Sequence, residues 1–134
     1  MYLIDTNIYS ALDRGEATVS RLLRDEPEIG VPLPVLAELR YGFALGDRAE
    51  ANERTLRKFI AQPAVRVVLP GEVTTRHYAE LHSFCRRSGR SLSQNDIWIA
   101  ALVRETGGTL LTFDKDFAAL QDLLDGGVRL IERR

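Results

Sequence analysis

The apolar and polar positions divide this chain into short apolar runs that alternate with longer segments of helical periodicity. Runs rich in apolar and β-branched residues lie at 1–4, 28–31, 65–69, 109–112 and 128–131, each next to polar, glycine or proline residues. Runs of this length indicate strands, and strands that are apolar on both faces are typical of parallel sheets covered by helices. The first run has no polar interruption, so we expect it to form a central strand.

Between these runs, apolar residues recur at the spacing of amphipathic helices. The pattern predicts helices over about residues 6–14, 17–24, 34–45, 47–62, 72–87, 94–105 and 114–124. Ser93 is expected to cap the helix that starts at residue 94. Gly46 is expected to end the helix predicted over residues 34–45. The alternation of strand and helix predicts one domain over residues 1–134, an α/β fold of three layers, α/β/α, around a parallel sheet.

Composition is that of an ordinary globular protein. Apolar residues make up 45% and charged residues 28% of the 134 residues, which excludes a disordered chain. The net charge of −1 gives no general attraction for nucleic acid, so RNA or DNA binding would depend on a local patch. Lys58 and Lys115 are the only lysines, so nearly all positive charge is arginine, which suits bidentate contacts to phosphate.

The cysteine and histidine content excludes a thiolate or histidine metal site. Cys85 is the only cysteine and is expected to fill an apolar position on a helix, which fits a reducing, cytoplasmic location. His77 and His82 are five residues apart, which does not place both on one helix face, and we expect them at the surface. No run of 18 apolar residues and no signal peptide is found, so no membrane association is expected.

Two carboxylates occupy unusual places in the first third of the chain. Asp5 directly follows the first strand, where ligands bind in parallel α/β sheets, although a turn or a helix cap would also explain it. Glu38 lies on the same side of its predicted helix as Val35 and Leu39, although an edge position or a pairing with the neighbours of Arg40 would also explain it.

Three further carboxylates follow later in the chain. Asp96 is three residues after Ser93, and a capping interaction explains it without any chemistry. The helix that continues from it is almost wholly apolar, so we expect its first turn to point from a buried element toward the edge of the sheet. Asp114 and Asp116 follow the fourth strand, where one could cap the next helix and one could complete a metal site.

The positions of these acids converge in a parallel sheet, because the carboxyl ends of the strands lie at one edge. Carboxylates gathered there would raise one another's pKa or bind divalent cations. A set of ligands made only of oxygen favours Mg²⁺ or Mn²⁺ over zinc. The chain has no Gly-x-Ser-x-Gly segment, no supported Cys–His pair and no phosphate-binding glycine loop, so other hydrolytic chemistries fit poorly.

Four segments of the chain contain the candidate acids together with their neighbours. The segments are Leu3-Ile4-Asp5-Thr6-Asn7, Ala37-Glu38-Leu39-Arg40-Tyr41-Gly42, Asn95-Asp96-Ile97-Trp98-Ile99-Ala100-Ala101 and Leu111-Thr112-Phe113-Asp114-Lys115-Asp116-Phe117. In order and spacing they resemble the PIN domain of VapC-type toxins. Each segment alone is a weak signal, but four in register across nearly the whole chain are specific.

The resemblance implies a five-stranded parallel sheet of order 3-2-1-4-5 and a Mg²⁺- or Mn²⁺-dependent endoribonuclease that cuts tRNA or another structured RNA. It also implies a cognate antitoxin encoded beside the toxin gene, and a homodimer. Asp116 competes with Asp114 for the fourth acidic position, and we favour Asp114 because it is nearer the end of the strand. By motif, the acidic quartet is Asp5, Glu38, Asp96 and Asp114, and the polar residues that orient it are Thr6, Asn7 and Thr112.

Three hypotheses about function remain open at this stage. The preferred one is metal-assisted RNA hydrolysis, with Asp5 and Asp96 as the closest metal ligands. A DNA nuclease or phosphatase that uses the same acids, and a PIN-like module that binds without catalysis, are the alternatives. The possible RNA contacts are Arg86, Arg87 and Arg90, although they would also suit a solvated helix end.

The helices over residues 34–62 carry more apolar faces than one sheet can cover. We expect the dimer and antitoxin interfaces there, around Tyr41, Phe43 and Leu45.

Overall fold

The computed structural model describes residues 1–133, which form alternating strands and helices. The strands are β1 (Tyr2–Ile4), β2 (Ile29–Pro32), β3 (Val65–Val68), β4 (Thr109–Thr112) and β5 (Val128–Leu130). The α-helices are α1 (Thr6–Asp13), α2 (Ala17–Leu23), α3 (Leu33–Leu45), α4 (Ala49–Ile60), α5 (Glu72–Arg87) and α6 (Gln94–Thr106). A 3₁₀ helix, η1 (Lys115–Leu123), joins the last two strands.

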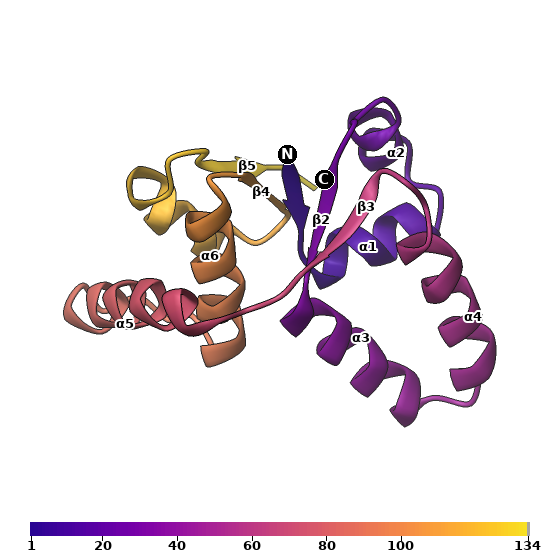
Figure 1. Cartoon of the computed structure of the whole chain (residues 1–134), viewed down its shortest axis with the longest axis horizontal. Coiled ribbons are helices and arrows are strands. Elements are labelled where there is room, and N and C mark those ends of the chain that lie inside the picture. Colours follow the sequence, from indigo (N-terminus) through magenta and orange to yellow (C-terminus); the bar gives the residue numbers. More distant parts are fainter. Residues whose placement is uncertain (134) are drawn as a thin grey trace.

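The five strands form one parallel sheet in the order β3-β2-β1-β4-β5, as predicted. Leu3 of β1 pairs with Gly30 of β2 on one side and with Leu110 of β4 on the other. The α5–α6 pair lies on one side of the molecule, and α3 and α4 extend on the other (Figure 1). The central place of β1 puts the residue that follows it, Asp5, in the middle of the carboxyl edge.

The core packs against both faces of the central strands. Leu3 and Ile4 of β1 are fully buried, as are Leu110 and Leu111 of β4. On α6, six of the seven residues from 97 to 103 are buried, and they include the small pair Ala100 and Ala101, which lets this helix approach the sheet closely. The carboxyl edge of the sheet is therefore supported by a rigid, apolar layer.

Two adjacent glycines connect α6 to β4. Gly107 ends α6 with a φ of 72°, in the left-handed region of backbone conformation. Glycine adopts this conformation without steric strain because it has no Cβ. A Cβ on Gly108 would lie 2.9 Å from the carbonyl oxygen of Met1 and would meet the side chain of Leu3. Gly108 therefore allows β4 to pair closely with β1, which sets the positions of the residues at the ends of both strands.

The helix predicted over residues 114–124 is a 3₁₀ helix instead of an α-helix. Its apolar residues Phe117, Leu120 and Leu123 recur every three residues, and Phe117 and Leu120 are buried. A three-residue period lines up along one side of a 3₁₀ helix but spirals around an α-helix, so the packing favours the tighter form.

The lone cysteine is buried, and the two histidines are half-buried. Cys85 is buried, as predicted. His82 is half-buried and packs edge-on against Tyr78, with ring centroids 5.3 Å apart, and Tyr78 stacks on Trp98 at 4.4 Å. His77 is also half-buried, so the expected surface positions are only partly right. Within residues 1–133, no helix is long and apolar enough to cross a membrane.

Candidate active site

Asp5 is a buried carboxylate held by two hydrogen bonds. It is the N-cap of α1, where its Oδ1 accepts from the backbone N–H of Ile8 at 3.1 Å. Its Oδ2 accepts from the Thr112 hydroxyl at 2.5 Å. The side chain is only 6% exposed, and burial raises the pKa of Asp5 against the lowering effect of these two bonds. Asp114 and Asp96 raise this pKa further, so negative charge gathers around it.

Asp96 lies in the first turn of α6 and is half-buried. Its backbone N–H donates to Ser93 Oγ at 3.1 Å, which confirms Ser93 as the helix cap. Burial raises the pKa of Asp96, hydrogen bonding with Ser93 lowers it, and Asp114 and Asp116 raise it. The cap explains why the turn forms, but a cap alone would not place the carboxylate among other acids.

Glu38 is half-buried on the second turn of α3 and makes no ion pair within residues 1–133. Its Oε1 accepts from the side-chain amide of Asn95, which also donates to the Pro34 carbonyl oxygen at 3.4 Å. Arg40 contacts Glu53 instead, with two hydrogen bonds of 2.9 Å, so it does not neutralise Glu38. The sequence predicts no role for Asn95 itself, although this residue opens the third of the segments that resemble the PIN domain.

Asp114 and Asp116 occupy different places after β4. Asp114 is half-buried and caps η1, its Oδ1 accepting from the backbone N–H of Asp116 at 2.9 Å. The backbone N–H of Asp114 donates to Thr112 Oγ1 at 3.0 Å, which links it to the partner of Asp5. Asp116 is exposed. This placement favours Asp114 as the fourth acid.

A small cavity of about 50 Å³ lies where these acids meet, large enough for one or two waters or an ion. The Thr6 hydroxyl is buried without a hydrogen-bond partner among the described residues. Thr112 does not line the cavity and acts on it through Asp5. The lining residues are Asp5, Thr6, Asn7, Glu38, Asp96, Ile99, Asp114 and Phe117, which include the whole acidic quartet.

Comparison with known proteins identifies the family. The family model described as the PIN domain matches residues 2–123. This chain belongs to the PIN domain family. Ribonuclease VapC5 of Mycobacterium tuberculosis is 27% identical over 118 residues, covering 88% of this chain and 86% of that protein. The plasmid stability protein StbB of Pseudomonas syringae pv. tomato is 31% identical over 122 residues, covering 85% and 88%.

Solved structures agree with the PIN fold. VapBC2 from Rickettsia felis, bound to a DNA fragment from its promoter, aligns with a TM-score of 0.83 at 23% identity and covers 98% of both chains. VapBC-5 from Mycobacterium tuberculosis, a member of a family of toxin-antitoxin systems, aligns with a TM-score of 0.73 at 25% identity and covers 98% and 97%. The predicted fold, strand order and family are confirmed.

The residues that line the small acidic cavity of this PIN domain have the chemistry to bind a hard divalent cation. The available ligands are all oxygens, two of the acids have raised pKa values, and the Thr6 hydroxyl lacks a partner within residues 1–133. No three acidic, histidine or cysteine side chains in the described chain are already grouped around one point. The donor set therefore fits Mg²⁺ or Mn²⁺.

The three arginines proposed for RNA contact lie outside this cavity. Arg86 and Arg87 end α5, Arg90 follows in the loop before α6, and all three are exposed. None of the three forms an ion pair with another described residue.

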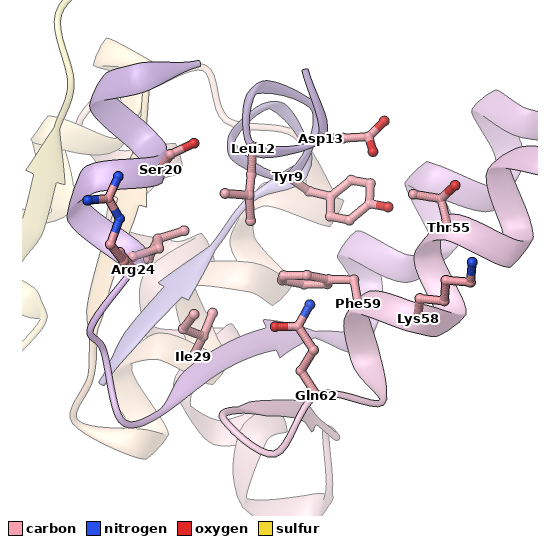
Figure 2. Close-up of a pocket in the computed structure, with 11 residues that line it drawn as sticks. Tyr9, Leu12, Asp13, Ser20, Arg24, Ile29, Thr55, Lys58, Phe59 and Gln62 are labelled. Carbon is pink, nitrogen blue, oxygen red and sulfur yellow. The ribbon is translucent and has the colours of Figure 1, made fainter. Parts of the chain in front are cut away.

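A second and larger cavity, of about 470 Å³, lies among α1, α2 and α4 (Figure 2). Tyr9 and Phe59 form part of its wall in an edge-to-face pair with centroids 5.3 Å apart. Burial, and after it the negative charge of Asp13, raise the pKa of Tyr9 to about 12, so its hydroxyl stays neutral. Among the described residues, Asp13 is the only carboxylate that lines this cavity, and Arg24 and Lys58 line it too, so it does not have the cluster of acids found in the small cavity. Sequence periodicity does not predict it.

Proposed function

We propose that this PIN domain is a divalent-metal-dependent endoribonuclease, the toxin of a toxin–antitoxin pair, that hydrolyses phosphodiester bonds of RNA. The observation that carries the proposal is that four carboxylates from four separate segments of the chain line one cavity at the carboxyl edge of the sheet. The ribonuclease name of relatives that align along most of the chain supports RNA as the substrate. A structured RNA such as tRNA is the substrate class we favour.

Asp5 and Asp96 are the proposed closest ligands of Mg²⁺ or Mn²⁺, and Glu38 and Asp114 complete the site. When bound, the cation supplies positive charge that acidifies water and offsets charge that develops on the phosphate. No side chain is then needed as a nucleophile.

Hydrogen bonds from surrounding residues orient the carboxylate of Asp5. The Thr112 hydroxyl and the Ile8 N–H hold both oxygens of Asp5, which opposes the effect of burial on its charge. Thr6 and Asn7 offer further oxygens at the cavity wall. Arg86, Arg87 and Arg90 are proposed to contact phosphates of the RNA strand beside the site.

Carboxylate–metal chemistry alone does not distinguish RNA from DNA or from a phosphate monoester. A DNA nuclease or phosphatase is therefore the alternative function of the same acids. A module that binds without catalysis is disfavoured because the acidic quartet is complete and shares one cavity.

The test uses the chain purified free of any antitoxin and incubated with total RNA and with DNA, in Mg²⁺, in Mn²⁺ and in chelator. RNA cleavage that needs the metal and disappears in Asp5→Asn and Asp96→Asn is the expected result. Cleavage in chelator, or full activity of either variant, would refute the site. Consumption of DNA or of a phosphatase substrate with intact RNA would instead establish the alternative.

The partners that we propose are an antitoxin encoded by a neighbouring gene and a second copy of this chain. The solved relative VapBC-5 comes from a toxin-antitoxin family. Tyr41 and Leu45 on α3 are 67% and 72% exposed, and Leu33 is exposed on the same helix, whereas Phe43 packs against the core. Because its RNA substrate and antitoxin would be cytoplasmic, we place the protein in the cytoplasm.

Co-expression with the neighbouring gene tests the antitoxin, because a bound small protein should abolish RNA cleavage. Light scattering tests the dimer. The double variant Tyr41→Ser and Leu45→Ser should shift the mass toward a monomer, and an unchanged mass would exclude these residues from the interface.

A further inference from the structure

Asn95 makes a cross-helix contact that links two acidic residues of the site. Its side chain leaves the first turn of α6 and donates to Glu38 Oε1 on α3, and to the Pro34 carbonyl oxygen at 3.4 Å. We propose that Asn95 is a positioning residue that fixes the Glu38 carboxylate at the metal cavity. This inference rests on the proposed nuclease function and adds a residue that acts through Glu38.

The chemistry of the contact requires a side-chain amide. Both partners of Asn95, the Glu38 carboxylate and the Pro34 carbonyl, are acceptors, so the residue between them must donate. Aspartate has nearly the same shape but, when ionised, only accepts, and it would repel Glu38. A hydroxyl side chain is shorter and carries a single hydrogen to donate.

Glu38 depends on this contact because it has no other side-chain partner within residues 1–133. Arg40, two residues further along α3, is held by Glu53 of α4 through two bonds of 2.9 Å. A free glutamate side chain has three rotatable bonds and samples many positions, which costs entropy when it must bind a cation. A bond from Asn95 removes part of that freedom before the cation arrives.

The position of Asn95 in the chain gives the contact a second effect. Asn95 and Asp96 are neighbours in the turn that Ser93 caps, the Asp96 N–H donating to Ser93 Oγ at 3.1 Å. The turn that presents Asp96 to the cavity therefore also holds Glu38. Asn95 sets the position of one acid relative to the other, although α3 and α6 are far apart in the sequence.

A double-mutant cycle on metal binding tests this proposal. The purified chain is titrated with Mn²⁺, and the concentration that gives half of the maximal rise in melting temperature is recorded for the wild type, Asn95→Leu, Glu38→Gln and the double variant. Asn52→Leu on α4 is the matched control, because Asn52 does not line the acidic cavity. RNA cleavage is measured beside it, with kcat and KM determined separately.

We expect Asn95→Leu to raise the Mn²⁺ midpoint by about 10-fold, a typical effect of losing a residue that orients a metal ligand. In the Glu38→Gln background the same change should have no further effect, because the residue acts only through Glu38. Cleavage should lose kcat at saturating RNA while KM stays within about twofold, since the substrate is not touched. If Asn95→Leu does not fold, Asn95→Ser, which leaves the turn polar but is too short for Glu38, replaces it in the cycle.

The outcomes separate the two levels of the argument. If Glu38→Gln binds Mn²⁺ and cleaves RNA like the wild type, the place of Glu38 in the proposed function is wrong. If Glu38→Gln is impaired but Asn95→Leu behaves like Asn52→Leu, the function stands and the role of Asn95 is overturned. An Asn95→Leu effect that persists at full size in the Glu38→Gln background also overturns it, because it would not pass through Glu38.

Discussion

Substitution of Thr112 tests most directly how the fold stabilises the buried carboxylate of Asp5. It is fully buried at the end of β4. Its hydroxyl donates to Asp5 Oδ2 at 2.5 Å and accepts the backbone N–H of Asp114 at 3.0 Å. Thr112→Val keeps the shape of the side chain and deletes both bonds, whereas Thr112→Ser keeps both bonds and deletes one methyl group.

The magnitude follows from the two bonds. A hydrogen bond to a charged acceptor contributes about 1.5–3 kcal/mol, and an unpaired amide costs about 1 kcal/mol, so Thr112→Val should lose about 2.5–4 kcal/mol. At about 3.5 °C per kcal/mol for a domain of this size, the melting temperature should fall by about 9–14 °C. Thr112→Ser should lose about 1 kcal/mol, or about 3–4 °C, for its buried methyl group.

The pH dependence identifies the cause. Burial raises the pKa of Asp5 above its ordinary value of 3.8, and the Thr112 bond opposes this rise. An acid with a raised pKa in the folded state destabilises the fold as pH rises from its unfolded pKa through its folded pKa. The Thr112 bond reduces that loss, so the deficit of Thr112→Val should be largest at neutral pH and should shrink as pH falls through the folded pKa of Asp5.

Urea unfolding in chelator, at neutral pH and at a series of lower pH values, measures this deficit for both variants. Thr112→Ser is the control for lost volume, and its deficit should not depend on pH. If Thr112→Val and Thr112→Ser were equally stable at neutral pH, the reasoning that the hydroxyl supports the Asp5 charge would be wrong.

Three other variants test neighbouring features. In chelator at neutral pH, Asp5→Asn should raise the melting temperature, because it keeps an acceptor for Ile8 and removes a buried charge; a lower melting temperature would show that the buried charge does not destabilise the fold. In Mg²⁺ or Mn²⁺ the same variant should lose RNA cleavage. Asp114→Asn should reduce kcat at least about 10-fold more than Asp116→Asn, and the reverse order would make Asp116 the fourth acid. Gly108→Ala should cost about 1–3 kcal/mol in urea unfolding, because its Cβ would press on Met1 and Leu3; wild-type stability would show that β4 can shift.

Much of the fold can be predicted from local patterns in the sequence. The uninterrupted apolar run of β1 marks a strand buried on both faces, and this strand is central in the sheet. Its position brings Asp5 beside Asp114, which follows the neighbouring strand β4. The approach of Asp5 and Asp114 could be predicted for this reason, because it depends only on strand order and on which residue follows each strand. The places of Glu38 and Asp96 depend in addition on how α3 and α6 pack at the same edge.

Other features depend on contacts that no local pattern encodes. Asn95 and Glu38 are 57 residues apart, and each has an adequate local explanation as a helix residue. The larger cavity depends on the relative placement of three helices, and its Tyr9–Phe59 pair joins α1 to α4. The 3₁₀ form of η1 follows from a three-residue period too short to separate from helical spacing before the structure is known.

Hydrogen bonds from neighbouring residues explain how acidic side chains can share one cavity. Carboxylates that approach one another without a cation raise each other's pKa, as Asp114 does to Asp5 and Asp96. Two of the acids take a donor from a neighbouring side chain: Asp5 from Thr112, and Glu38 from Asn95. If these acids hold a cation, the donors would orient the carboxylates for it and would so influence the free energy of binding. Metal affinity in this PIN domain should therefore respond to Thr112 and Asn95, which are not proposed as ligands, as well as to the four acids proposed to hold the ion.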